Sequence, residues 1–166
     1  MNIFATYEGP IESARWLWEL DPTKGRKMIV ESCQLLSMAI ARLDSKYYEK
    51  SKLYKILKSQ IKGRFVNWLC EENENFYWLI DYVSMLLLLY RRKTNKEHGS
   101  SGCFREIRDW AGKQGTGDTR TPFVPYAQAK SKPQYSVLPE DCADVCKAYR
   151  IYLKRQVLND PNYWEE

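Results

Sequence analysis

The segment 22–43 constrains the fold more than any other part of the chain, because its apolar residues point in nearly every direction of a helix. Asp21-Pro22 is a good helix start, with a carboxylate that can cap the first turn and a proline at the first position. At about 100° per residue, the apolar positions that spread around this helix are Met28, Ile29, Val30, Cys33, Leu35, Leu36, Met38, Ala39, Ile40 and Leu43. A helix that is apolar nearly all round is buried, so other helices must surround it.

The rest of the chain also predicts helices rather than strands. The whole chain has 166 residues, which fits one domain, and it shows neither internal repeats nor a continuous β-pattern. The further helices that we expect cover Ile11 to Leu20, Tyr47 to Leu57, Ile61 to Lys93 with a break near Glu72-Asn73, Phe104 to Trp110, and Pro139 to Leu158. The predicted fold class is mostly α: a single irregular helical bundle over residues 1–166, with a short extended N-terminal segment and a long loop (112–138) before the last helix.

Several classes of protein are excluded by what the sequence lacks. Five cysteines without a C-x-x-C pair predict neither a disulfide framework nor a zinc site, and we expect no bound metal or cofactor. No glycine-rich phosphate loop is present. The N-terminus has no basic-then-apolar signal segment, and the longest apolar run, Val83 to Tyr90, is too short to span a bilayer. We therefore expect a cytoplasmic, monomeric protein with no membrane partner.

The charge distribution favours a nucleic-acid partner. The formal net charge is +5, and seven Lys and Arg residues lie between Lys46 and Arg64, opposed only by Glu49. Phosphate backbones attract such a stretch, although a solvated lysine-rich helix face is the alternative interpretation. The candidate contacts to a DNA backbone are Lys55, Lys58, Lys62, Arg64, Arg92 and Lys96.

The buried second helix carries a narrow polar edge. Lys27, Glu31 and Gln34 fall within one sector about 60° wide. Polar groups on a buried helix are either paired or directed into a cleft. Because Lys27 and Glu31 are four residues apart, one alternative is that they form an ion pair with no further role.

A second polar stripe occurs on the long helix predicted after residue 61. Trp68, Glu71, Asn75 and Trp78 follow one another at spacings of three, four and three, which places them on one face. A carboxylate, an amide and two indoles could form a base-binding wall. They could equally form a packed aromatic seam with one solvated glutamate, and the spacing does not distinguish the two.

The single histidine, His98, follows Tyr90 and a run of cations that includes Arg92 and Lys96. Cations at a helix end complement the helix dipole, which is a structural explanation. A histidine among cations that bind phosphate is the functional explanation. Further along, Gln128 in the predicted loop is able to read a base edge.

These residues carry a family resemblance. Five short motifs occur in the same order in a set of small helical phage and bacterial proteins. They are the opener Met1-Asn2-Ile3-Phe4, the Lys27 to Leu36 motif with Glu31 and Gln34, the Trp68 to Leu79 motif, the Tyr90, Lys96, His98 run, and Thr121-Pro122-Phe123 with Gln128. The chain resembles these proteins, which are grouped with the pyrimidine-dimer DNA glycosylases. It is also similar in size and type to an antiphage glycosylase that removes glucosylated hydroxymethylcytosine from phage DNA.

The chain departs from this family at three places. The dimer glycosylases use an N-terminal threonine amine, whereas Met1 precedes Asn2 in this chain. Asp21-Pro22-Thr23-Lys24 stands where relatives often carry Cys-Asp-Lys-His, and Lys62-Gly63-Arg64 replaces a common Asn-His-Pro segment. We therefore expect a monofunctional enzyme, without an imine-forming lyase step.

The resemblance implies excision of a modified or damaged pyrimidine from double-stranded DNA, leaving an abasic site. The catalytic candidates are Glu31, Glu71 and His98. The candidates for contacts to the substrate are Lys27, Gln34, Trp68, Asn75, Trp78, Tyr90 and Gln128. Two alternatives stay open at this point: a non-catalytic nucleic-acid-binding phage accessory or inhibitor protein, and an enzyme acting on free nucleotides.

Overall fold

The computed structural model describes residues 3–56, 62–117, 119–123 and 132–166, and these residues contain helices and no strand. The α-helices in chain order are α1 (Pro10–Leu20), α2 (Pro22–Leu43), α3 (Ser45–Lys50), α4 (Arg64–Glu71), α5 (Asn73–Thr94), α6 (Ser101–Ala111) and α7 (Val145–Leu158). A short 3-10 helix, η2 (Pro133–Tyr135), precedes α7. The predicted mostly α fold, an irregular helical bundle, is confirmed.

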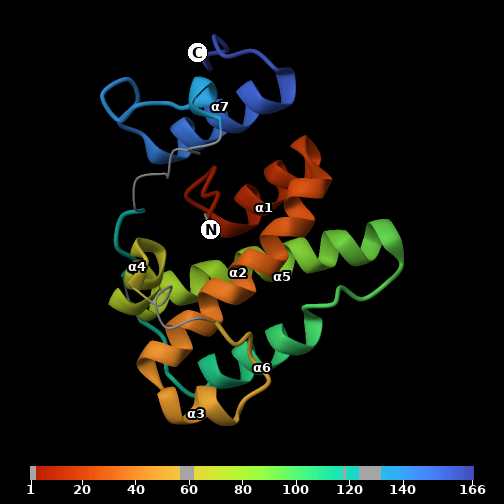
Figure 1. Cartoon of the computed structure of the whole chain (residues 1–166), viewed down its shortest axis with the longest axis vertical. Coiled ribbons are helices and arrows are strands. Elements are labelled where there is room, and N and C mark those ends of the chain that lie inside the picture. The colour runs from red at the N-terminus through yellow and green to blue at the C-terminus, as the bar shows by residue number, and fades with distance from the viewer. Residues whose placement is uncertain (1–2, 57–61, 118, 124–131) are drawn as a thin grey trace.

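Helix α2 lies at the centre of the bundle, as its apolar pattern predicted. Pro22 occupies the first turn, and the Asp21 carboxylate accepts a hydrogen bond from the Lys24 backbone N–H at 3.0 Å. Helices α1, α3, α4, α5 and α6 all contact α2. Figure 1 shows α1, α2 and α5 crossing in the middle of the molecule, with α3 and α6 at one end and α7 at the other.

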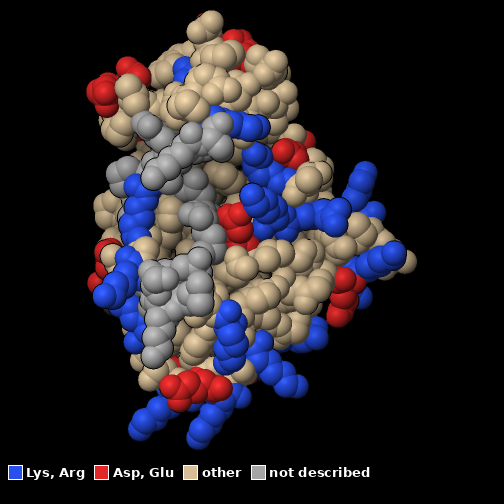
Figure 2. Space-filling view, viewed as in Figure 1, with Lys and Arg blue, Asp and Glu red and all other residues tan. Residues whose placement is uncertain are grey.

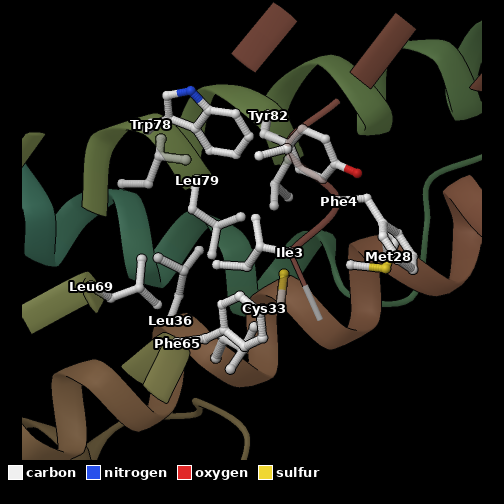
Figure 3. Close-up of a cluster of buried hydrophobic side chains, with 14 of the residues drawn as sticks. Ile3, Phe4, Met28, Cys33, Leu36, Phe65, Leu69, Trp78, Leu79 and Tyr82 are labelled. Atoms are coloured by element: carbon white, nitrogen blue, oxygen red, sulfur yellow. The ribbon is translucent and has the colours of Figure 1, made fainter. Parts of the chain in front are cut away.

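The first described residues are part of the core. Ile3, Phe4 and Ala5 are buried, and Ile3 lies among side chains of α2 and α5 that include Cys33, Leu36 and Leu79 (Figure 3). Burial of such apolar side chains contributes on the order of 2 kcal/mol each. The N-terminal segment therefore holds α2 and α5 together instead of lying on the surface.

Helix α7 packs over the N-terminal segment. The rings of Phe4 and Tyr149 meet edge to face, with centroids 5.7 Å apart. The Arg150 guanidinium donates a hydrogen bond to the Thr6 backbone oxygen at 2.6 Å. These contacts connect the C-terminal end of the chain to its N-terminal end (Figure 1).

The expected break in the long helix is present. Glu72 has extended backbone angles (φ −142°, ψ 145°) and separates α4 from α5. Helix α5 ends at Thr94 and is capped by Asn95, which adopts the left-handed conformation with φ 54°. Asparagine tolerates this conformation better than most residues, so it stops the helix at low cost.

The predicted third helix was wrong at its C-terminal end, because α3 ends at Lys50. The chain after α3 folds back over Tyr48. The Tyr48 hydroxyl donates to the Tyr54 carbonyl at 3.0 Å and accepts from the Ile56 N–H at 3.0 Å. These bonds replace helical ones, and the helical pattern expected for Tyr47 to Leu57 gave no sign of this return.

The predicted start of the last helix at Pro139 was also wrong. The Leu138 carbonyl accepts bonds from the N–H groups of Asp141 and Cys142, which forms a turn. Helix α7 begins at Val145, where the Asp144 carboxylate accepts from the Lys147 N–H at 3.0 Å. Asp144 is therefore the cap that the sequence reading missed.

Among the described residues, no helix is both long enough and apolar enough to cross a membrane.

Candidate functional site

The polar edge of α2 carries an ion pair. The Lys27 ammonium lies 3.4 Å from a Glu31 carboxylate oxygen, one helical turn away. The Lys27 side chain is 73% exposed, whereas that of Glu31 is only 19% exposed. Gln34 is half-buried. The edge thus holds a carboxylate that is withdrawn from solvent and a lysine that reaches over it.

A second lysine, Lys24, interacts with the Glu31 charge. Burial is the main cause that lowers the pKa of Lys24; the charges of Asp21 and Glu31 oppose it, and those of Lys132 and Lys27 act with it. The Lys24 ammonium also donates to the Gln156 side chain at 3.1 Å. Three lysines from α2 and from the segment before η2 therefore share one electrostatic neighbourhood with the Glu31 carboxylate.

The sequence analysis missed Tyr82, which lies on α5 within reach of the Glu31 charge. Tyr82 is fully buried, and its hydroxyl has no hydrogen-bond partner among the described residues. Burial, followed by the negative charge of Glu31, raises the pKa of Tyr82 far above its usual value, so the hydroxyl keeps its proton. In the sequence, Tyr82 lies at core spacing with Leu79, Val83 and Leu86, so it looks like an ordinary core residue. The phenol oxygen is the one feature that could have pointed to a functional role.

Trp68, Asn75 and Trp78 lie in the interior of the protein. The Trp68 indole N–H donates to the Pro122 carbonyl at 3.0 Å, and the Trp78 indole N–H donates to the Glu8 carbonyl at 2.7 Å. The two indoles meet edge to face with centroids 6.3 Å apart. The stripe predicted from the spacing exists, and its rings contact protein on both sides.

The segment 119–123 covers this stripe. The Phe123 ring lies 5.6 Å from that of Trp68 and 5.1 Å from that of Trp78, measured between centroids. The remaining gap beside Trp68 and Phe123 has a volume of about 10 Å³, which is too small for a base. A stacking role for either indole therefore requires Phe123 to move.

Asn75 fixes the position of the same segment. Its amide nitrogen donates to the Trp68 carbonyl at 2.6 Å and to the Thr121 hydroxyl oxygen at 2.7 Å, and its amide oxygen accepts from the Thr121 N–H at 3.0 Å. The Thr121 hydroxyl donates in turn to a carboxylate oxygen of Glu71 at 3.1 Å. The buried amide is thus satisfied by protein groups.

Glu71 is exposed and lines a cavity of about 190 Å³ at the junction of α4, α5 and α6. Phe76, Tyr77 and Trp110 contribute aromatic side chains to this cavity, and Glu72 contributes a second carboxylate. Glu31 does not line it. The two carboxylates proposed as catalytic therefore belong to different places on the molecule.

His98 is held by Tyr90 and by the backbone. The two rings meet edge to face with centroids 4.9 Å apart, and the Ser100 N–H donates to His98 Nδ1 at 3.1 Å. Burial and, to a lesser degree, the charge of Arg26 lower the pKa of His98, so the imidazole is neutral at pH 7. It lines a groove between α5 and α6, apart from Glu31 and Glu71.

The candidate phosphate contacts are at the surface but are spread out. Lys62, Arg64, Arg92 and Lys96 are exposed, and Lys55 lies over the Tyr48 ring with its ammonium 4.3 Å from the centroid. Figure 2 shows Lys and Arg side chains along one margin, at the lower tip and on the opposite side of this face, around a central acidic spot. Lys58 and Gln128 lie outside the described residues.

No metal-ligand group of three or more His, Cys, Asp or Glu side chains occurs in the described part of the chain.

The chain matches no family model, no curated protein and no solved structure. Its chemistry must therefore be argued from its own side chains.

Proposed function

We propose that the protein is a monofunctional DNA glycosylase that excises a modified or damaged pyrimidine, with Glu31 as its essential carboxylate. The observation that supports this proposal most is the Glu31 environment: a carboxylate withdrawn from solvent, paired with Lys27, that interacts with the Lys24 charge and acts on the pKa of a buried phenol. A titratable group whose pKa is shifted by burial together with a specific neighbouring charge, as that of Tyr82 is, is typical of active sites.

The chemistry follows from the charges of the reaction. Cleavage of an N-glycosidic bond develops positive charge on the sugar and negative charge on the departing base. The Glu31 carboxylate can stabilise the sugar cation or activate the attacking water, and water adds across the broken bond. The protonated Tyr82 hydroxyl and the Lys27 ammonium can donate hydrogen bonds to the base. Lys27 and Gln34 then serve as base or sugar contacts.

Binding of a flipped nucleotide requires a local rearrangement. Trp68 and Trp78 are covered by Phe123, so a base can stack on them only after the segment 119–123 is displaced. That displacement breaks the bonds between Asn75 and Thr121 and frees Glu71 from the Thr121 hydroxyl. The exposed cations that would bind phosphates, at several places on the surface, are Lys55, Lys62, Arg64, Arg92 and Lys96.

A second candidate is a nucleic-acid-binding protein without catalytic activity. It is favoured by the pairing of Lys27 with Glu31 inside one helix and by the burial of Trp68, Asn75 and Trp78. In this case the exposed lysines carry the binding, and affinity falls with salt while no base is released.

One experiment separates these functions. The protein is incubated with unmodified, dimer-containing and glucosylated hydroxymethylcytosine-containing DNA, and with free nucleotides, followed by alkali. Alkali-labile breaks on one DNA substrate support the glycosylase. Retarded DNA without breaks supports the binding protein, and conversion of free nucleotides alone contradicts both.

Two variants assign the carboxylate. Glu31→Gln should reduce excision by about 10² or more while DNA affinity stays within about two-fold, because a neutral amide cannot stabilise the cation. Glu71→Gln tests the cavity at the α4–α5 junction in the same way. Glu19→Gln, at an exposed position of α1, is the matched control and should behave as the wild type. Excision by Glu31→Gln at the wild-type rate would remove Glu31 from the mechanism.

A further inference from the structure

A groove of about 300 Å³ lies between the C-terminal half of α5 and helix α6. Its apolar surface comes from Leu87, Leu88 and Phe104, and Leu88 is 41% exposed. This volume is at the lower end of the range for small-ligand sites, about 300–1,000 Å³. The groove is therefore large enough for one small ligand.

Three arginines line the same groove. Arg91 comes from α5. Arg105 and Arg108 are three residues apart on α6, which places them on one face of that helix. The one acidic residue of the lining, Glu97, lies 3.7 Å from the Arg105 guanidinium. Arg91 and Arg108 make no ion pair of 4.0 Å or less within the described part of the chain. Three guanidinium groups against one carboxylate give the groove a positive charge.

The other titratable groups near the groove do not cancel this charge. His98 lines it as a neutral imidazole, since burial and Arg26 lower its pKa. Asp81, one helix turn before the groove on α5, interacts with the Arg108 charge and offsets part of it, although burial and Glu74 raise the pKa of this carboxyl. Three guanidinium groups then face two carboxylates, and the groove stays positive. An anion is the ligand that this arrangement favours.

We propose that the α5–α6 groove binds one nucleotide, free or as a unit of a DNA strand, with its base on Leu87, Leu88 and Phe104 and its phosphate on Arg91 and Arg108. Guanidinium groups bind phosphate through paired hydrogen bonds, and apolar side chains accept the flat face of a base. The two halves of the groove match the two halves of a nucleotide. This proposal goes beyond the glycosylase function, because it involves no residue of the Glu31 site.

The test uses the full chain and isothermal titration with dTMP, inorganic phosphate, a thymidine tetranucleotide and an oligoglutamate peptide. The wild type should bind dTMP more tightly than phosphate or oligoglutamate. Tighter binding of the tetranucleotide identifies a strand site, and equal binding identifies a free-nucleotide site. Equal affinity for dTMP and phosphate, or tighter binding of oligoglutamate, would overturn the proposal.

Two double variants assign the binding to the groove. Arg91→Gln/Arg108→Gln should weaken dTMP binding by about ten-fold or more, because both guanidinium contacts to the phosphate are lost. Lys93→Gln/Lys113→Gln removes two exposed positive charges from the same region of the chain and should leave the affinity within about two-fold. Equal weakening in both would show that general charge, and not the groove, holds the ligand.

A third variant tests the apolar half. Leu88→Ala should reduce the preference for dTMP over inorganic phosphate, because the exposed leucine contacts only the base. Thermal unfolding of each variant checks that the fold is intact. Glu31→Gln should bind dTMP as the wild type does, so loss of excision in that variant and loss of groove binding in the arginine variant are independent results.

Discussion

The thiols of Cys33 and Cys103 share a hydrogen bond across the contact between α2 and α6. This bond is the largest cause that lowers the pKa of Cys103 to about 7, and the Ser37 hydroxyl, 3.8 Å from the Cys103 sulfur, acts in the same direction. Burial opposes both. A thiolate is therefore favoured on α6 and a protonated thiol on α2.

Cys103 should consequently react with iodoacetamide at neutral pH. Because the thiolate is the nucleophile, its alkylation rate should rise with pH and reach half its maximum near pH 7. Cys70 is also half-buried, but burial raises its pKa, so its alkylation should reach half its maximum at a higher pH than that of Cys103. Mass spectrometry of the labelled peptides measures both rates in one sample.

The Cys33→Ala variant is the control for this prediction. Without the donated hydrogen bond, burial becomes the largest influence on Cys103, and the midpoint of its alkylation should move to a higher pH. An unchanged midpoint would mean that the two thiols do not interact.

Gly25 is required where α1, α2 and α5 cross. A Cβ atom at this position would lie 2.8 Å from the Trp18 ring and 3.7 Å from Leu86. Gly25→Ala should therefore lower the free energy of unfolding by about 1–3 kcal/mol, although alanine favours a helix by about 1 kcal/mol. Urea unfolding followed by circular dichroism measures the change.

Gly102 provides the matched comparison on α6. It is also helical, and a Cβ atom there would meet nothing within 4 Å. Gly102→Ala should thus leave the stability unchanged or raise it by up to about 1 kcal/mol. Stabilisation by both substitutions would contradict the close approach of Trp18 to α2.

The sequence predicted the central elements of the fold well, because their signals are local. Helix α2 has the expected bounds, since Asp21-Pro22 and the all-round apolar pattern are contained in the segment itself. The signal for the break at Glu72 is likewise contained in the segment itself. In contrast, the return of the chain over Tyr48 after α3 depends on hydrogen bonds between residues that no helical periodicity describes.

The candidate site was only partly predictable for the same reason. Spacing placed Lys27 beside Glu31, and it placed Trp68, Asn75 and Trp78 on one stripe. Spacing could not show that Phe123, about fifty residues away, would cover that stripe. Tyr82 and the arginine groove depend on how α5 faces α2 and α6, which is a property of the assembled bundle.

The Asn75 amide is expected to hold the segment 119–123 in place. Asn75→Ala removes a donor to the Trp68 carbonyl and both bonds to Thr121, and it leaves buried groups unsatisfied. We expect a loss of about 2–4 kcal/mol in the free energy of unfolding, measured by urea titration. Thr121→Ala should cost less, and the double variant should cost less than the sum of the two because they share bonds. Additive losses would argue against the shared bonds.

Substitution of Tyr82 separates an effect on stability from an effect on function. Its hydroxyl is buried without a partner among the described residues, a condition that costs about 1–3 kcal/mol. Tyr82→Phe should therefore leave the free energy of unfolding unchanged or raise it by about 1 kcal/mol. If the hydroxyl assists the departing base near Glu31, the same variant should lose about ten-fold or more in excision rate.

Tyr135→Phe is the control for an ordinary buried tyrosine. Its hydroxyl bonds to the Asn159 side chain at 2.5 Å, so removing it should lower the free energy of unfolding by about 1 kcal/mol and leave excision unchanged. Chemical denaturation and the alkali-cleavage assay measure the two effects on the same preparations. A Tyr82→Phe protein that is less stable than the wild type would assign the hydroxyl a structural bond. A Tyr82→Phe protein that is as stable as the wild type and fully active would exclude Tyr82 from the chemistry, because excision would then not need the hydroxyl.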